Sequence, residues 1–416
     1  MAHAEIQLTD ADTKLPAGLA GKSPLFLLVG LATLAAGAAF AFSVGGWKHF
    51  QFTYLTAFMT WLTVSLGGMI FLLIHNVFRA GWHVSVRRLA EMVVANFWPW
   101  IPIAFLPIFI PIVMGDYALL KWLNPEMLDP TSPAYDSIVA NKSAFLNKGF
   151  LIARLVTYFT VWALISRFLT GNSIKQDSDG DPKRTRRLEM RSAPLIPIFA
   201  LTITFAGIDL QMSLDPHWFS TIWGVYLFAG GLGTFMATLG LLTMLVQNFG
   251  GMGHVTKEHY HDIGKLMFAF TFFWGYIAFS QYMLIWYANI PEETIYYDLR
   301  QTGVWATTSI VLLFGKLLIP FLGLLSRHIK RNRKTLAFWA FWMLFFHFVD
   351  HYQIVMPNLA KKLGTPGEMP TPGAELLMWL GMGMTFMSLT LMRAKSQSLV
   401  PLRDPRLRES LAFHNI

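Results

Sequence analysis

The sequence predicts an all-α integral membrane protein with about ten transmembrane helices, and two observations lead to this class. First, 54% of the 416 residues are hydrophobic and only 14% are charged, whereas about a quarter of the residues of a soluble domain are charged. Second, the apolar residues fall into blocks of about 20, the length that crosses a bilayer as a helix. The expected architecture is two four-helix bundles flanked by two further helices.

The ten apolar blocks are placed to within a few residues at each end. They lie at 24–44, 52–78, 91–114, 146–169, 194–213, 219–249, 261–289, 303–326, 335–355 and 373–393. The third block holds four prolines between residues 99 and 111. We expect this helix to be kinked, because each proline removes a backbone hydrogen bond.

These blocks divide the chain into six parts. The parts are a cytoplasmic N-terminal tail (1–23), a first flanking helix (24–51), a first four-helix bundle (52–213), a second four-helix bundle (214–355), a segment with the last flanking helix (356–393) and a cytoplasmic C-terminal tail (394–416).

The distribution of lysine and arginine gives the expected orientation. Of the 33 basic residues, about 22 lie in the two tails or in loops after even-numbered helices, and about 7 lie in loops after odd-numbered helices. The contrast is strongest in the basic run 327–334 and in the polar loop 170–191, which we expect to be solvated. Because basic loops stay in the cytoplasm, both ends of the chain are predicted to be cytoplasmic.

The composition also excludes several kinds of site and partner. The chain contains no cysteine, so it forms no disulfide, no cysteine-ligated iron–sulfur cluster and no c-type haem attachment of its own. Its net charge of +9 comes mostly from the short loops that set orientation in a membrane. We therefore expect a lipid bilayer and no nucleic acid as its surroundings, and no covalently bound cofactor.

Ionisable side chains inside apolar blocks are costly and therefore indicate functional positions. The ninth block carries His347, Asp350 and His351 near its predicted non-cytoplasmic end. Their spacing of three and four residues places the three side chains on one face of a helix. A histidine beside a carboxylate is suited to proton exchange near neutral pH.

Two further blocks reach the same outer depth. The fifth ends with Asp209 and Gln211, and the fourth begins with Arg154 and Tyr158, which are one helical turn apart. An arginine next to a carboxylate holds the carboxylate ionised. We expect Arg154 to pair with Asp209 or with Asp350.

A second, inner layer of ionisable groups is expected toward the cytoplasm. His261 and Lys265 open the seventh block on one helix face, and Lys316 lies in the middle to inner part of the eighth. A cytoplasmic proton-entry path would use such groups. The alternative for both layers is a set of interfacial side chains that reach water or pair for packing.

Three long segments resemble one family of polytopic membrane proteins. They are AGIDLQMSLDPHWFSTIWGVYLFAGG (206–231), HDIGKLMFAFTFFWGYIAFSQYMLIWYANIPEET (261–294) and HFVDHYQIVMP (347–357). Over nearly its whole length the chain resembles the NrfD/PsrC-like family of quinone-linked membrane subunits. The resemblance is greatest to the F subunits of bacterial alternative complex III, a quinol:cytochrome c or electron-acceptor oxidoreductase.

The resemblance implies a subunit of a complex in the bacterial cytoplasmic membrane that oxidises a quinol and passes the electrons outward. The implied partners are an iron–sulfur protein, multihaem and monohaem cytochromes c, and a paralogous NrfD-like membrane subunit. The iron–sulfur clusters and haems c would be carried by these partners, and a quinone is the ligand that this chain itself would bind. The family's quinone site lies near the outer surface in the first bundle, at the depth expected for Arg154, Tyr158 and Asp209.

The resemblance also implies proton half-channels through the bundles. The positions that suit them are Asp209, Asp350, His351, His347, Lys316, His261 and Lys265. Two other functions remain open at this stage: a secondary transporter with the same charged residues as substrate and proton sites, and a membrane scaffold in which they do no chemistry. A transporter would show helices broken at mid-membrane in both halves, and a scaffold would tolerate neutral substitutions of these residues.

Overall fold

A computed structural model of the chain describes residues 8–369 and 372–415. Within these ranges the protein is helical, with no β-strand. The α-helices are α1 (Asp10–Thr13), α2 (Ala17–Val77), α3 (Val84–Val94), α4 (Trp100–Met114), α5 (Ser137–Asn141), α6 (Lys148–Asp179), α7 (Pro182–Leu210), α8 (Trp223–Asn248), α9 (Lys257–Ala288), α10 (Pro291–Arg300), α11 (Val304–Leu312), α12 (Ile319–Gly323), α13 (Arg327–Arg331), α14 (Arg333–Lys362), α15 (Gly373–Ala394) and α16 (Leu407–Leu411). A π-helical segment, Leu313–Leu318, joins α11 to α12.

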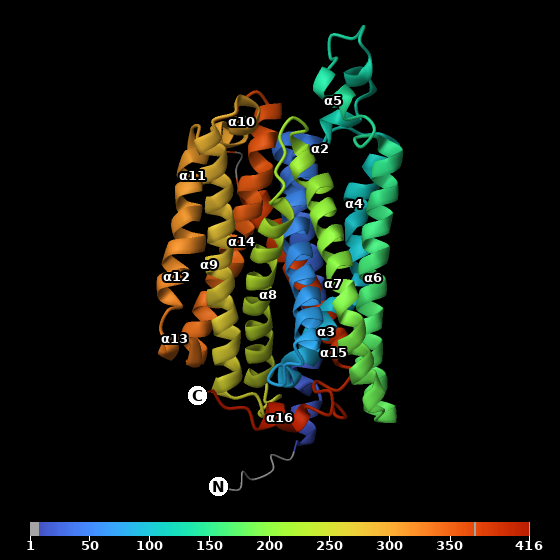
Figure 1. The fold of residues 1–416 in the computed structure, drawn as a ribbon, viewed down its shortest axis with the longest axis vertical. Helices are drawn as coiled ribbons and strands as arrows, with labels where there is room; N and C mark the ends of the chain where they lie inside the picture. The colour runs from blue at the N-terminus through green and yellow to red at the C-terminus, as the bar shows by residue number, and fades with distance from the viewer. Residues whose placement is uncertain (1–7, 370–371, 416) are drawn as a thin grey trace.

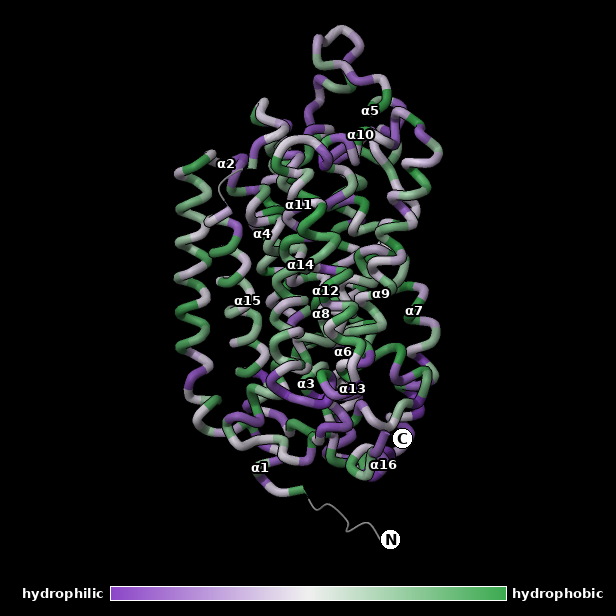
Figure 2. The backbone as a smooth tube through the Cα atoms, turned by 90° about the vertical axis from the view of Figure 1, so that its left-hand side faces the viewer, coloured by the Kyte–Doolittle hydropathy of each residue, from purple (hydrophilic) through white to green (hydrophobic). Residues whose placement is uncertain are grey.

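The long helices stand side by side in one elongated bundle (Figure 1). We call the end that carries α13 and α16 the basic end, and the end that carries α5 and α10 the opposite end. Hydrophobic residues form a band between these two more hydrophilic ends (Figure 2). Of the predicted tails, residues 1–7 and 416 lie outside the described residues.

Eight helical segments of the described chain are long and apolar enough to cross a membrane. They are Asp10–Val77, Val84–Met114, Lys148–Asp179, Pro182–Leu214, Trp223–Asn248, Lys257–Ala288, Val304–Gly323 and Gly373–Ala394. The predicted all-α class, with several such helices, is therefore confirmed. Helix α14 is not among the eight, because polar residues between His347 and Gln353 interrupt its apolar sequence.

Helix α2 reverses direction in its middle. Its backbone departs from helical geometry at two glycines, of which Gly46 has a φ of 62°, a left-handed conformation that favours glycine. In the first half, Gly30 lies against Thr385 and Gly37 lies against Met378. Residue numbers thus rise in α2 as they fall in α15, so this half runs antiparallel to α15.

The second half of α2 runs parallel to α15. His49 Nε2 lies 2.9 Å from Glu375 Oε1, and Trp61 Nε1 donates a 2.9 Å hydrogen bond to the carbonyl of Trp379. The two halves are therefore antiparallel to each other and correspond to the first two apolar blocks. Both halves contact α15, which explains why the last long helix of the chain packs beside the first.

The proline-rich third block is interrupted at its first proline. A 3₁₀ turn at Ala95–Phe97 ends α3, and α4 then continues as one helix through Pro107 and Pro111. Pro111 has no N–H to give to the Pro107 carbonyl. Gln51 of α2 supplies this hydrogen bond instead, with its Nε2 3.1 Å from that oxygen.

The prediction of a loop at 170–191 is wrong, because most of this segment is helical. Helix α6 continues to Asp179 and α7 starts at Pro182, so only two residues separate them. Gly180 ends α6 with a φ of 67°, and the Asp181 side chain accepts from the Lys183 N–H at the start of α7. The sequence is polar here because these helical turns project beyond the apolar band, and not because the chain is unstructured.

The backbones of α2 and α8 are in contact where the two helices cross, because glycines lie at the crossing. A Cβ added to Gly67 would lie 2.4 Å from the Gly231 carbonyl oxygen, and a Cβ added to Gly231 would lie 2.5 Å from the Thr63 carbonyl oxygen. Small residues allow helices in membranes to approach in this way.

We expect Gly67→Ala to destabilise the folded protein by about 1–3 kcal/mol, because its methyl group must push two backbones apart. Thermal unfolding of the detergent-purified protein measures this change. Gly171→Ala on α6 is the matched control, since nothing lies within 4 Å of its added Cβ. Equal melting temperatures for the two variants would contradict the close crossing.

Candidate functional site

The most unusual buried group is Lys316, which lies in the π-helical segment between α11 and α12. π-Helical turns are rare and occur frequently at functional sites. The Lys316 ammonium forms an ion pair with Asp350 of α14 and lies 4.3 Å from the ring centre of Trp274 of α9. Both members of the pair are buried, at 8% and 2% exposure.

Asp350 accepts a second hydrogen bond, from the Tyr226 hydroxyl of α8. Helix α8 can approach this closely because a Cβ on Gly230 would lie only 3.4 Å from the Lys316 Nζ. Tyr226 is itself stacked on Trp223, with 5.4 Å between ring centres. Four helical elements therefore hold one buried carboxylate and its counter-ion.

Two histidines extend this group along α14. Lys316 Nζ lies 3.3 Å from His347 Nδ1, and His347 Nε2 lies 2.9 Å from the Thr63 hydroxyl. The same hydroxyl lies 3.1 Å from His351 Nε2, and the Gln211 amide nitrogen lies 2.8 Å from His351 Nδ1.

The hydrogen-bond partners assign the tautomers of both rings. Lys316 and the Gln211 amide are donors, so the Nδ1 atoms of His347 and His351 accept. Each ring then donates from Nε2 to Thr63, whose own hydroxyl donates to the Met59 carbonyl at 2.8 Å. We call the set Lys316, Asp350, Tyr226, His347, Thr63, His351 and Gln211 the central network.

The central network lies in the middle of the bundle, which differs from two predictions. His347, Asp350 and His351 were expected near an outer helix end, but α14 continues to Lys362. Lys316 was expected in a separate inner layer, yet it contacts two residues of the supposed outer layer. The two-layer interpretation of these residues is therefore wrong.

Pro357 lies two residues after the predicted end of this block, and a proline commonly marks a helix end. In α14 it is tolerated inside the helix. Arg300 of α10 donates from Nε to the Gln353 carbonyl at 3.1 Å and from Nη2 to the Ile354 carbonyl at 2.7 Å. The first of these carbonyls is the one that the proline leaves without an N–H partner.

A small cavity adjoins the ammonium of the central network. Its volume is about 20 Å³, which is space for about one water molecule. Lys316, Trp274, Thr234 and Thr271 supply its polar side chains. Its lining residues Met343 and Thr234 lie toward the basic end from His347 and Gly230, so the cavity is on the basic-end side of the central network.

The predicted pair of Arg154 and Asp209 is present. Arg154 donates to both carboxylate oxygens, at 2.9 and 2.8 Å, and Tyr158 donates to Oδ2 at 2.8 Å. We call these three residues the outer triad. Its arginine also lies over the rings of Phe145 and Phe150, at 3.8 and 4.3 Å from their centres. A bidentate arginine with two ring contacts is among the stronger side-chain arrangements in proteins.

The outer triad and the central network approach each other through one short segment. Asp209 belongs to the triad and Gln211 to the network, and both lie at the end of α7 near the opposite end of the bundle. Ser213 donates to the Asp209 carbonyl at 2.6 Å and fixes the turn after the helix. The two sites are thus adjacent along the chain.

His261 and Lys265 lie apart from both sites, at the basic end of α9. Lys265 forms an ion pair with Asp262 and donates to Asn415 at 2.8 Å. Trp274, which lies against Lys316, is thirteen positions after His261, about 20 Å along a helix. Mostly apolar residues line this interval, so the expected inner group is not in contact with Lys316.

Three features of the buried polar groups were not predicted from the sequence: Tyr226, Thr63 and an ion cluster at the basic end. Tyr226 gave no signal beyond lying in a segment that resembles the family. Thr63 did give one, because four threonines of α2 repeat on one face; they are Thr53, Thr56, Thr60 and Thr63. Such a polar stripe inside an apolar helix indicates contact with polar groups of neighbouring helices.

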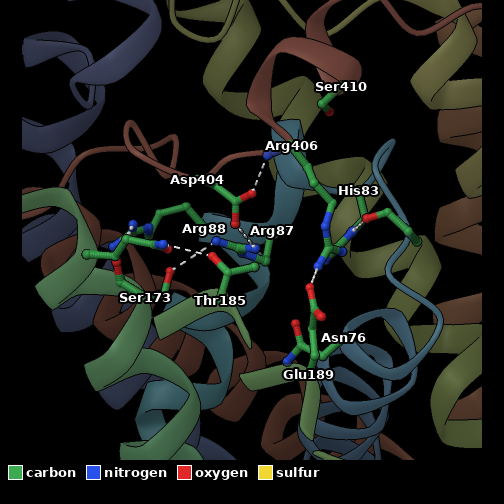
Figure 3. Close-up of polar contacts among 12 residues, drawn as sticks. Asn76, His83, Arg87, Arg88, Ser173, Thr185, Glu189, Asp404, Arg406 and Ser410 are labelled. Carbon is green, nitrogen blue, oxygen red and sulfur yellow. Dashed lines mark hydrogen bonds and ion pairs between the residues drawn. The ribbon is translucent and has the colours of Figure 1, made fainter. Parts of the chain in front are cut away.

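The third missed group is a buried ion cluster at the basic end (Figure 3). Arg87 of α3 donates to Asp404 at 2.7 Å, and Arg88 donates to Asp177 at 2.6 Å. Glu91 lies 3.1 and 3.2 Å from the two arginines. These contacts tie α3 to α6 and to the C-terminal segment, and every member has a partner, so the cluster is structural.

The described residues contain no group of three or more histidine, aspartate or glutamate side chains placed to hold a metal ion. Comparison of the chain with protein-family models finds no match, and comparison with curated proteins finds none either.

Proposed function

We propose that this chain is a membrane subunit of a quinol-oxidising electron-transfer complex of the alternative complex III type, in which the central network carries protons. The observation that carries the proposal is the buried Lys316–Asp350 ion pair inside an otherwise apolar bundle. Such a pair is costly to bury, and charges inside a membrane protein commonly mark ion or proton pathways. The resemblance of three long segments to quinone-linked subunits is the basis for proposing quinol oxidation as the reaction.

The proposal includes ten membrane spans with both ends in the cytoplasm. Counting the two antiparallel halves of α2 separately and adding α14 raises the eight apolar segments to ten. The basic end then faces the cytoplasm, because it carries most of the lysine and arginine. The grouping of the helices into two four-helix bundles remains a prediction.

Proton transfer through the central network needs one rearrangement. In the arrangement described, both histidines donate to Thr63, so no proton can pass that hydroxyl. Gln211 Oε1 is buried without a hydrogen-bond partner in the described part of the chain. If the amide turns over, this oxygen accepts from His351 Nδ1, and His351 Nε2 becomes free to accept from Thr63.

Protons then shift by one place along the network. Lys316 gives a proton to His347 Nδ1, and His347 gives its Nε2 proton to Thr63. Thr63 gives its hydroxyl proton to His351 Nε2, and His351 gives its Nδ1 proton to a water molecule on the Gln211 side, which carries it away as hydronium. Lys316 regains a proton from a hydronium ion that enters the adjoining cavity from the basic end. One proton has then crossed the network toward the opposite end.

The outer triad is the proposed contact for quinol. A quinol loses two protons and two electrons on oxidation, and Asp209 is a carboxylate that can accept a proton from a hydroxyl within hydrogen-bond distance. Phe150, whose ring lies 4.3 Å from the Arg154 guanidinium, is 46% exposed and is the proposed surface against which the quinol ring packs. The electrons go to a metal centre on a partner, since this chain has no cysteine to ligate an iron–sulfur cluster.

The proposed partners follow from this division of labour. They are an iron–sulfur protein, multihaem and monohaem cytochromes c, and a paralogous membrane subunit, all assembled in a bacterial cytoplasmic membrane.

The secondary transporter is less well supported, because the break between α3 and α4 lies near the basic end and not at mid-membrane. At this break, Asn96 donates a 2.9 Å hydrogen bond to Thr390 and accepts one from Arg393. The π-helical segment does break a helix beside the buried Lys316–Asp350 pair, but no matching break lies beside charged residues at mid-membrane in the described part of the first bundle.

Purification through a C-terminal tag in mild detergent tests the assignment. We expect cytochromes c and an iron–sulfur protein to co-purify, identified by mass spectrometry, and added quinol to reduce the haems, followed by their optical spectrum. A chain that emerges alone and colourless across several mild detergents contradicts the assignment and favours the transporter.

A further inference from the structure

A cleft of about 410 Å³ opens at the basic end between α7 and the C-terminal segment. We call it the arginine cleft. Its lining residues are Arg79, Pro182, Thr185, Arg186, Glu189, Pro405 and Arg406. Three arginines and one glutamate give it a net charge of about +2, and Figure 3 shows Thr185, Glu189 and Arg406 around it.

The single carboxylate of the cleft is already neutralised. Glu189 forms ion pairs with Arg406 and with Arg79, whose Nε lies 3.1 Å from Oε2. Among the described residues Arg186 forms no ion pair, and its side chain is exposed on the first turns of α7. The start of a helix also carries a partial positive charge. The cleft therefore has a net positive charge that its lining residues do not neutralise.

The neighbouring charges repel one another. Burial lowers the pKa of Arg406, and the nearby Arg87 and Arg79 guanidinium groups lower it further. An anion in the cleft relieves this repulsion. Arginine forks fit phosphate oxygens in a bidentate manner.

The surroundings of the cleft suit an amphiphile. Phe78 precedes Arg79 and is 77% exposed, and Met190 follows Glu189 and is 65% exposed. Exposed apolar side chains therefore flank the residues that line the cleft. Basic pockets between helices on the cytoplasmic side of membrane proteins bind anionic lipid headgroups.

We propose that the arginine cleft binds a phosphate group, as carried by an anionic phospholipid headgroup or by free phosphate. The site is independent of the quinol reaction and stands whether or not that assignment holds. Its backbone supports the same view, because Arg79 has a φ of 52°. Few residues other than glycine adopt this conformation, so this arginine occupies a position at which glycine would be less strained.

The test is a thermal-unfolding titration of the purified protein with three probes. They are phosphatidylglycerol, phosphatidylcholine as the zwitterionic lipid, and inorganic phosphate. A rise in melting temperature with phosphatidylglycerol alone identifies a lipid headgroup as the source, and a rise with both phosphatidylglycerol and inorganic phosphate identifies free phosphate as sufficient. No rise with either anion overturns the proposal.

Matched variants locate the site. Arg186→Gln is expected to weaken phosphatidylglycerol binding about fivefold, from about 1 kcal/mol per basic residue at a membrane surface. Arg187→Gln removes the same charge from the next residue of α7, which does not line the cleft, and should leave binding unchanged. Equal losses in the two variants would mean diffuse surface attraction and overturn the assignment of the cleft.

Arg79→Gly separates binding from folding. The substitution relieves the left-handed backbone, so the protein without lipid should melt no lower than the native protein. Its response to phosphatidylglycerol should nevertheless fall. A variant that melts lower without lipid and responds normally to it would show that Arg79 has only a structural role, contrary to the proposal.

Discussion

Asp350→Leu is expected to destabilise the protein by about 3–5 kcal/mol, because it leaves the Lys316 ammonium buried without its counter-ion. Lys316→Met should do the same by leaving the carboxylate unpaired. The double variant should recover most of the lost stability, since two apolar side chains of similar size replace a costly buried ion pair. Thermal unfolding of the purified complex measures all three effects.

The control for this cycle is a second lysine–aspartate pair. Lys14 pairs with Asp10 at the basic end, and their side chains are 71% and 85% exposed. Lys14→Met should cost less than about 1 kcal/mol, the usual value of an exposed pair. If Lys316→Met and Asp350→Leu each lower the stability by as little as the control variant does, the central pair is hydrated and not buried as described.

Arg154→Lys is expected to lower quinol turnover at least about tenfold, although it keeps the positive charge. Lysine cannot reproduce the two parallel hydrogen bonds to Asp209 or the flat contact with two phenyl rings. Hydrogen bonds to charged groups contribute about 1.5–3 kcal/mol, which corresponds to a factor of ten or more in rate. Turnover with a soluble quinol, measured on the purified complex, gives this value.

Arg167→Ala on the same helix is the control for the outer triad. Its side chain is exposed, so removing it should leave turnover unchanged. Asp209→Asn keeps the shape of the carboxylate but cannot take up a proton. If Asp209 takes up the quinol proton, the loss of turnover should be large below the pH at which quinol itself begins to ionise and should shrink above it, whereas a purely structural role would give the same loss at every pH. Normal turnover in both Arg154→Lys and Asp209→Asn would refute the quinol contact.

The sequence predicted the helical class and the outer triad because both depend on local information. Apolar block length gives the helices, and the spacing of Arg154 and Tyr158 places them on one face of α6. Their partner Asp209 lies on α7, the next helix along the chain, so adjacency in sequence made the contact predictable. Sequentially adjacent helices usually pack together.

The central network could not be assembled in this way. Its depth depends on where α14 ends, and Arg300, a residue of another helix, decides this by supplying the hydrogen bonds around Pro357. The π-helical segment also sets which way Lys316 points. Neither a tertiary hydrogen bond nor a change of helical period is visible in apolar block length. The same limit explains the mistaken loop at 170–191, where polarity was read as absence of structure.

The central claim is that the network of Lys316, Asp350 and their histidines carries protons during quinol oxidation. Proton release per electron, measured in vesicles that contain the purified complex, tests it most directly. The Lys316→Met, Asp350→Leu double variant is the sample to compare, because it should stay folded while lacking the proton carrier. The account predicts that this ratio falls in the double variant while the complex remains assembled. An unchanged ratio at an unchanged rate of electron transfer would contradict it and leave the chain as a scaffold.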